Sequence, residues 1–162
     1  MRRSKNLNPP SFCPISSLVY ILDESHTPIT PISFGRIQAV AITNHQLRQL
    51  SPTVLAYLGD GVYELYVRAV YLQPQRLQAY HQRVVAQVRA ESQAAQLTKI
   101  LPLLTPDELE IVRRGRNAVK KSPKRLAVDI YQQATSLETL IGYLYLHDLD
   151  RLLDLLSKFD FD

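Results

Sequence analysis

Cysteine is almost absent from the sequence, which contains only Cys13. A single thiol cannot form an internal disulfide, so the chain suits a reducing compartment and we expect it in the cytoplasm. Long apolar runs are also absent: no stretch of about 18 apolar residues occurs, so we expect no membrane-spanning helix. No cluster of cysteine and histidine has the spacing of a zinc site. The histidines are scattered and each is expected on the surface: His26, His45, His81 and His147.

Charge of either sign is not in strong excess. The sequence has 19 Lys and Arg against 15 Asp and Glu, a formal net charge of +4. A balance this modest gives only a weak preference for acidic partners. With 162 residues, of which 46% are hydrophobic, the chain is long enough for one domain with its own hydrophobic core.

Proline is concentrated at the start of the chain. Half of the ten prolines lie in the first 42 residues: Pro9, Pro10, Pro14, Pro28 and Pro31. Proline lacks a backbone donor and disfavours both long helices and central strands. We therefore predict that residues 1–42 form a disordered or loosely attached extension, and that residues 43–162 form one folded domain.

From residue 43 onward the apolar residues recur at helical spacing, with no alternating pattern typical of strands. Ser51-Pro52 and Thr105-Pro106 are typical helix starts, because a hydroxyl caps the helix and proline occupies its first position. Pro74 and Pro102 indicate helix ends. The sequence thus predicts an all-α fold, with helices at about 52–72, 75–101, 106–115, 126–146 and 149–158.

Side-chain spacing within these helices gives further expectations. Leu109 and Val112 are predicted to face the core from the helix that begins at 106. Five tyrosines recur at helical spacing, and we interpret them as core and interface residues rather than as platforms for stacking bases: Tyr57, Tyr63, Tyr66, Tyr143 and Tyr145.

Two glycines flank Asp60 inside the first predicted long helix. Because glycine costs about 1 kcal/mol relative to alanine in a helix interior, we expect Gly59 and Gly61 to permit the close approach of another backbone. A carboxylate beside the core is expensive to bury unless it is paired or binds a cation. Glu64 lies one turn further on, and we expect it to pair with Arg68 rather than to hold a water near Asp60.

A matching feature occurs in the predicted helix 126–146. Glu138 stands among apolar and small neighbours, and Gly142 follows one turn later. If the two glycine-containing helices cross closely, Asp60 and Glu138 meet, and the repulsion between like charges would raise the pKa of one of them. A divalent cation removes that conflict, and oxygen ligands suit Mg²⁺, with Mn²⁺ as a substitute. The spacing alone is equally compatible with two separate carboxylates that are solvated or paired with arginines.

A basic segment occupies residues 113–125. Seven of its 13 residues are Lys or Arg, and no acid occurs between Ile111 and Val128. Such a segment is often only a solvated loop. As a loop beside an acidic site, it could instead contact the phosphates of an RNA duplex, which proteins read largely by shape and backbone. The residues we expect to bind RNA are Arg114, Arg116, Asn117, Lys120, Lys121 and Lys124.

Three motifs, in this order, resemble the ribonuclease III catalytic domain and, within it, the Mini-ribonuclease III family. They are LAYLGDGVYELYVR at 55–68, RGRNA at 114–118 and ATSLETLIGYLYL at 134–146. The resemblance covers roughly 47–156. It implies a helical, ribonuclease III-like endonuclease that binds double-stranded RNA as a homodimer, the two subunits forming one RNA-binding valley.

The resemblance further implies that Asp60 and Glu138 are catalytic metal ligands and that the substrate is a precursor of large-subunit ribosomal RNA. At three positions where classical ribonuclease III has additional acids, this chain has Thr53, Ala56 and Thr135, as the Mini family also differs there. Water, substrate phosphate or the hydroxyls of Thr135 and Ser136 would have to complete the metal shell. No separate double-stranded-RNA-binding domain follows in this sequence, so the basic segment is expected to contribute more of the binding.

The reaction implied is metal-dependent hydrolysis of phosphodiester bonds in both strands, which leaves 5′-phosphate and 3′-hydroxyl ends. Two rivals stay open. One is a catalytically inactive module of the same fold that grips RNA or a ribosomal particle, which fold alone does not exclude. The other is a helical interaction protein with no RNA role, which leaves the basic segment unexplained.

Overall fold

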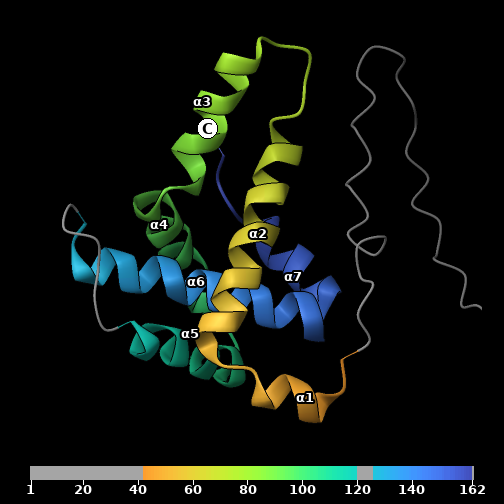
Figure 1. The fold of residues 1–162 in the computed structure, drawn as a ribbon, viewed down its shortest axis with the longest axis vertical. Coiled ribbons are helices and arrows are strands. Elements are labelled where there is room, and N and C mark those ends of the chain that lie inside the picture. The colour runs from red at the N-terminus through yellow and green to blue at the C-terminus, as the bar shows by residue number, and fades with distance from the viewer. Residues whose placement is uncertain (1–41, 120–125, 162) are drawn as a thin grey trace, which may run out of the picture. The chain divides into compact units, whose positions relative to one another are not determined.

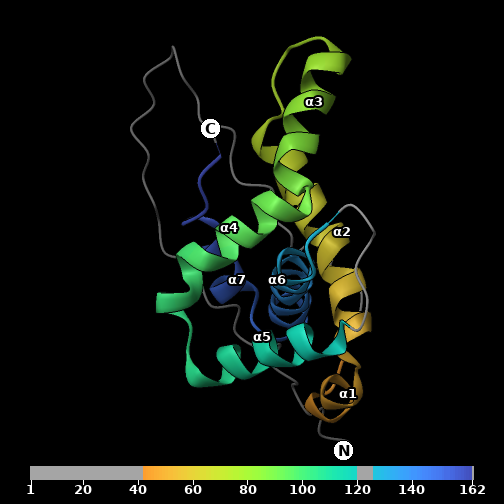
Figure 2. The ribbon, with the colours of Figure 1, turned by 90° about the vertical axis from the view of Figure 1, so that its left-hand side faces the viewer.

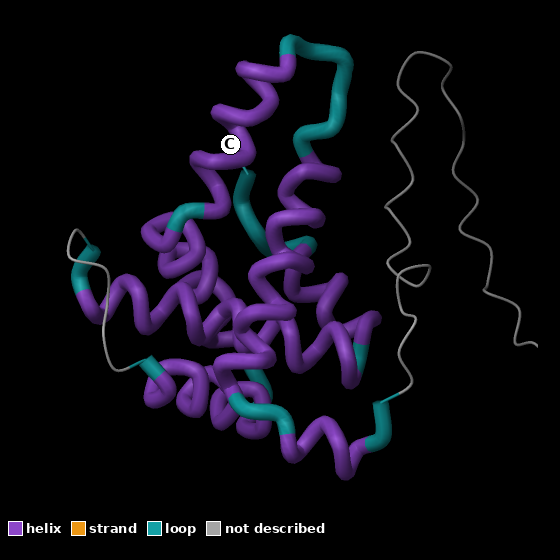
Figure 3. Tube along the Cα trace, in the orientation of Figure 1, coloured by secondary structure: helices purple, strands orange, loops and turns teal. Residues whose placement is uncertain are grey.

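The computed structural model describes residues 42–119 and 126–161, all within one compact unit of the chain. Throughout these residues the backbone forms helices and loops without any strand (Figure 3), so the predicted all-α fold is confirmed. Most of residues 1–42, for which we predicted an extension, lie outside the described residues. The helices are α1 (Asn44–Gln49), α2 (Pro52–Val70), α3 (Leu77–Val88), α4 (Ala90–Ile100), α5 (Pro106–Ala118), α6 (Val128–His147) and α7 (Leu149–Leu156), with a 3₁₀ turn at Leu101–Leu103.

Helix α6 lies at the centre of the domain. It contacts α1, α2, α4, α5 and α7, and in Figure 2, which looks almost along its axis, the four longer neighbours surround it. A helix enclosed in this way must be apolar or small on nearly every face. Its buried residues meet that requirement: Ala134, Ser136, Leu137, Thr139, Leu140, Ile141, Gly142, Leu144 and Tyr145.

Two helix starts form as the sequence predicts. The Ser51 hydroxyl accepts a hydrogen bond from the Val54 backbone N–H at 3.3 Å, at the head of α2. At the head of α5, Thr105 and Glu108 cap each other reciprocally: the Thr105 N–H donates to Glu108 Oε2 at 2.8 Å, and the Glu108 N–H donates to Thr105 Oγ1 at 3.3 Å. The same pairing of Thr43 with Gln46 begins α1, which the sequence analysis did not predict.

The predicted single helix over 75–101 is wrong, because the chain breaks it at Arg89 into α3 and α4. Arg89 is extended, with ψ at 154°, and caps the start of α4. The carbonyls around the break find side-chain donors: Gln87 O accepts from the Tyr63 hydroxyl at 3.2 Å, and Val88 O accepts from Gln93 Nε2 at 3.2 Å. One distant and one local side-chain hydrogen bond therefore offset the helical bonds lost here.

Helix α5 differs from the prediction in two further respects. It does not end near Gly115, as predicted, but continues to Ala118. Leu109, expected to face the core, is 41% exposed, whereas Ile111 is buried. Val112 packs against the core as predicted.

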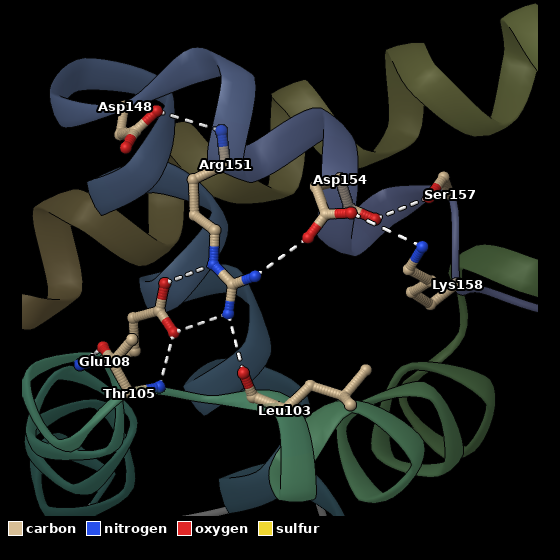
Figure 4. Close-up of polar contacts among 8 residues, drawn as sticks. All are labelled: Leu103, Thr105, Glu108, Asp148, Arg151, Asp154, Ser157 and Lys158. Carbon is tan, nitrogen blue, oxygen red and sulfur yellow. Dashed lines mark hydrogen bonds and ion pairs between the residues drawn. The ribbon is translucent and has the colours of Figure 1, made fainter.

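The start of α5 is tied to α7 by a buried ion pair, which we call the α5–α7 junction (Figure 4). Arg151 donates from Nε to Glu108 Oε1 at 2.8 Å and from a terminal nitrogen to Glu108 Oε2 at 3.0 Å. The same terminal nitrogen donates to Leu103 O at 2.7 Å, and the other reaches Asp154 at 2.9 Å. The Glu108 side chain is only 7% exposed, and its hydrogen bonds from Arg151 hold its pKa below the usual range.

Candidate active site

Two glycines allow α2 and α6 to touch, at what we call the α2–α6 crossing (Figure 1). A Cβ on Gly59 would collide with the Glu138 carbonyl and lie 2.8 Å from the Gly142 nitrogen. A Cβ on Gly142 would collide with the Leu55 carbonyl and lie 3.1 Å from the Gly59 nitrogen. The close helix approach predicted from these two glycines is therefore present, and it brings the turn carrying Asp60 against the turn carrying Glu138.

Gly61 does not have the same role. A Cβ there would find no atom within 4 Å in the described chain. The expectation that both glycines around Asp60 admit a neighbouring backbone is right for Gly59 and wrong for Gly61 within this fold.

Both carboxyls at the crossing have raised pKa values. Burial raises the pKa of Glu138 to about 7, the nearby charge of Asp60 adds to this, and a hydrogen bond from the Gln93 side chain opposes it. The pKa of Asp60 is also raised, first by partial burial of its carboxyl and then by the charge of Glu64, although the residue as a whole is exposed. Glu64 pairs with Arg68 at 2.6 Å, as the sequence analysis expected.

Gln93 is a residue of this site that sequence analysis missed. It lies in α4, is 2% exposed, and hydrogen-bonds Glu138 and the Val88 carbonyl through its amide. Its Oε1 is a buried acceptor without a partner in the described chain. Nothing in the sequence distinguishes Gln93 from the exposed glutamines common in helices, because its significance comes from the packing of α4 against α6.

The oxygen ligands at the crossing suit a hard divalent cation. Two carboxylates repel each other there, and a cation would remove that repulsion. The amide oxygen of Gln93 accepts no hydrogen bond within the described chain. Across the described ranges no group of three or more His, Cys, Asp or Glu side chains could hold a metal. This chemistry suits a cation such as Mg²⁺, which keeps several of its waters when few protein ligands bind it.

Ser136, considered as a further ligand, faces the other way. Its hydroxyl donates to the Gln132 carbonyl at 2.7 Å, and its Cα would lie 3.0 Å from a Cβ on Gly115 of α5. Ser136 therefore packs beneath α5 instead of completing a metal shell. Thr135 is half-buried, and its carbonyl accepts a hydrogen bond from Thr139 at 2.7 Å.

The part of the basic segment that we expected to form a loop after about residue 115 is helical as far as Ala118. Arg116 and Asn117 are exposed on the last turns of α5, and Arg114 is half-buried. Gly115 packs against α6, since a Cβ there would lie 2.6 Å from Thr139 Oγ1. This contact sets the basic end of α5 beside the turn of α6 that carries Glu138. The predicted RNA contacts Lys120, Lys121 and Lys124 lie outside the described residues.

Comparison with known proteins gives a consistent result. Residues 53–149 match the Ribonuclease III domain family. Mini-ribonuclease 3 of Synechococcus sp. is 59% identical over 112 residues, which are 68% of this chain and 81% of the relative. Mini-ribonuclease 3 of Thermoanaerobacter sp. is 41% identical over 120 residues, 72% of this chain and 84% of the relative.

A solved structure agrees with these relatives. The crystal structure of protein FN1578 from Fusobacterium nucleatum superposes with a TM-score of 0.60 at 30% sequence identity, covering 68% of this chain and 94% of that one. The helical fold and the matched domain define an endoribonuclease of the ribonuclease III class, a class that acts on double-stranded RNA and is generally dependent on divalent metal. Within it, the chain belongs to the Mini-ribonuclease III family.

Proposed function

We propose that this endoribonuclease hydrolyses double-stranded RNA at the α2–α6 crossing, with Asp60 and Glu138 holding the divalent metal, Mg²⁺ or in its place Mn²⁺. The observation that carries the proposal is the contact between Gly59 and Gly142, which draws two carboxylates close enough for one to raise the pKa of the other. Perturbed carboxyls held by rigid helices are typical of catalytic sites.

Each residue of the site has a distinct part in the reaction. When bound, the metal lowers the pKa of water and stabilises negative charge on the phosphate. Asp60 is exposed and so is open to a phosphate approaching from solvent, whereas the Glu138 carboxyl accepts a hydrogen bond from Gln93 of α4. Hydrolysis would leave 5′-phosphate and 3′-hydroxyl ends.

RNA binding is assigned to the basic end of α5 and the residues that follow it. Arg116 and Asn117 are exposed on the last turns of α5, where they can contact the phosphates of a duplex. Arg114 would support them, and Lys120, Lys121 and Lys124 would extend the surface. Such contacts position the duplex without reading its sequence.

The active form is proposed to be a homodimer formed through one face of α2. Val54, Tyr57 and Gly61 share that face, and Tyr57 is 86% exposed, although a tyrosine side chain offers a large apolar surface for burial. Gly61 has no neighbour within 4 Å in the described chain, so a second copy could approach its backbone closely. Sedimentation of the natural protein as a stable monomer at working concentration would exclude the dimer.

The substrate proposed is a precursor of large-subunit ribosomal RNA, in keeping with the family, and the place of action is the cytoplasm. Cys13 is the single cysteine of the sequence, so no internal disulfide can form, which suits a reducing compartment. None of the helices in the described ranges is both long and apolar enough to cross a membrane.

Cleavage of an end-labelled RNA duplex in Mg²⁺ tests the proposal. We expect the natural protein to cut, and Asp60→Asn and Glu138→Gln to bind the duplex in a gel shift while cutting it at least about 100-fold more slowly. Arg113→Gln is a control for loss of a charge outside the site, because Arg113 pairs with Glu110 at 2.6 Å and is not assigned to RNA. It should bind and cut the duplex like the natural protein. A natural protein that binds the duplex but cuts it with neither Mg²⁺ nor Mn²⁺ would instead be an inactive RNA-binding module.

A further inference from the structure

Gln93 lies in the second turn of α4 with almost no exposed surface. Its Nε2 donates to the Val88 carbonyl at 3.2 Å, and its side chain also hydrogen-bonds the Glu138 carboxyl. These two bonds join the end of α3 to the middle of α6. Both bonds use the amide nitrogen as donor, and the amide oxygen accepts no hydrogen bond within the described chain.

Gln96, one turn further along α4, shows what a satisfied buried glutamine looks like in the same helix. Its Nε2 donates to the Asp160 carbonyl at 2.6 Å, and its Oε1 accepts from the Asp160 N–H at 3.2 Å. Gln93 is equally buried, yet its Oε1 has no donor within the described chain. An unpaired buried acceptor is destabilising, so Oε1 is expected to accept a hydrogen bond from a group that the described residues do not include.

The donor cannot be one of the neighbouring carboxylates when they are ionised, because a carboxylate only accepts hydrogen bonds. Since Oε1 and Nε2 share one carbon atom, Oε1 lies close to the Glu138 carboxyl that the amide contacts. A hydrated divalent cation held by Asp60 and Glu138 would bring water O–H donors to this place, and Mg²⁺ in particular retains several waters.

We propose that Gln93 is a positioning residue of the active site, which orients the Glu138 carboxylate with its amide N–H and accepts a hydrogen bond at Oε1 from a water hydrating the bound cation. The role rests on the proposed function, because it presupposes the metal at Asp60 and Glu138. Groups that orient metal ligands in this way typically change metal affinity or activity by about 10- to 100-fold when replaced.

The first test is direct binding of Mn²⁺ alone to the full chain, by calorimetry, without RNA. Gln93→Leu keeps the size of the side chain and removes both hydrogen-bonding atoms, and we expect it to weaken Mn²⁺ binding about 10-fold. Gln96→Leu is the matched control: it removes a buried amide from the same helix, so it should lower the melting temperature and leave Mn²⁺ affinity unchanged. Binding by Gln93→Leu within about twofold of the natural protein would overturn the proposal.

Gln93→Glu provides a second, independent readout. It preserves an oxygen acceptor of the same length but adds a negative charge beside Asp60 and Glu138. We expect its melting temperature to be lower than that of the natural protein in EDTA and to rise more on addition of Mn²⁺, because the cation offsets the third charge. An equal rise in the two proteins would mean that Gln93 is only a packing residue.

The failure of this role and the failure of the proposed function give different results. If the natural protein cuts duplex RNA, Asp60→Asn does not, and Gln93→Leu binds Mn²⁺ normally, only the role of Gln93 is lost. If the natural protein does not bind Mn²⁺, both proposals are overturned.

Discussion

Two glutamates in neighbouring helices, Glu108 and Glu138, have opposite electrostatic environments. At the α5–α7 junction, Arg151 donates two hydrogen bonds to Glu108 and the Thr105 N–H a third, which together hold the pKa of Glu108 low. At the α2–α6 crossing, Glu138 faces burial and the charge of Asp60, and its pKa rises to about 7. Glu108 has a cationic partner and stabilises the fold, whereas Glu138 has no cationic partner among the described residues and a hydrogen bond from Gln93 only partly offsets its burial.

The largest effect should follow from closing the space at the crossing. Gly59→Ala puts a Cβ onto the Glu138 carbonyl, and backbone on both sides cannot yield as a flexible side chain would. We expect a loss of at least about 3 kcal/mol in the free energy of unfolding, at the upper end of overpacking effects. Urea unfolding followed by circular dichroism measures it.

Gly61→Ala is the matched control, in the same helix two residues away. Because its Cβ would meet nothing in the described chain, the change should be neutral or raise the stability of the monomer by up to about 1 kcal/mol. An equal loss of monomer stability at Gly61 and at Gly59 would mean that contact with α6 does not explain the loss at Gly59, because helix propensity alone favours alanine at both positions.

This contrast also shows what sequence can predict about such a site. The glycines drew attention to Asp60 and Glu138 because glycine in a helix interior demands an explanation. The sequence could not say which glycine touches another helix, since Gly59 and Gly61 have nearly identical surroundings along the chain. Gln93 gave no signal at all, because its burial depends on how α4 packs.

Helix boundaries, too, were predictable only where nearby side chains determine them. The starts of α2 and α5 were predictable because Ser51 and Thr105 cap them through hydrogen bonds within the first turn. The break at Arg89 was not, since no glycine or proline marks it and one of the donors that stabilise it, Tyr63, comes from α2, while the other, Gln93, follows the break in α4. Local chemistry can be read from sequence, and tertiary hydrogen bonds cannot.

The second effect in size is at the α5–α7 junction. Glu108→Gln removes the buried carboxylate of the pair and leaves Arg151 with the exposed Asp154 as its charged partner, and breaking a buried pair from one side typically costs about 3–5 kcal/mol. Because Arg151 is 25% exposed, we expect the low end, about 3 kcal/mol, in urea unfolding. Mn²⁺ binding should be unchanged.

In contrast, Glu138→Gln should stabilise the metal-free protein while weakening Mn²⁺ binding. Equal destabilisation by Glu108→Gln and Glu138→Gln would remove the distinction between the two glutamates.

The third effect is a pH dependence of opposite sign for the two glutamates. Between its ordinary pKa of 4.5 and about 7, Glu138 binds more protons in the folded protein than in the unfolded chain. The stability of the metal-free protein should therefore fall as pH rises through that window, by on the order of 2–3 kcal/mol. Glu108, whose pKa is lowered, contributes stability above its ordinary pKa that is lost as pH falls through its folded value.

Urea unfolding in EDTA at about pH 5 and about pH 7.5 separates these contributions. The difference in stability between Glu138→Gln and the natural protein should be larger at the higher pH, because only there is the natural carboxyl ionised against Asp60. A difference that stays constant over this range would mean that Glu138 is not perturbed.

The smallest effect should come from Glu64, whose charge also faces Asp60 but is paired on the surface. Its bond to Arg68 is 2.6 Å long, yet both side chains are more than a third exposed, so solvent screens the pair. Glu64→Gln should change stability by no more than about 0.5 kcal/mol, the range of exposed pairs one helical turn apart. Because the charge of Glu64 contributes to the raised pKa of Asp60, the variant should also lower that pKa, observable by NMR titration of the Asp60 carboxyl. A large stability loss with no change at Asp60 would place Glu64 with Glu108, as a structural acid, rather than with the crossing.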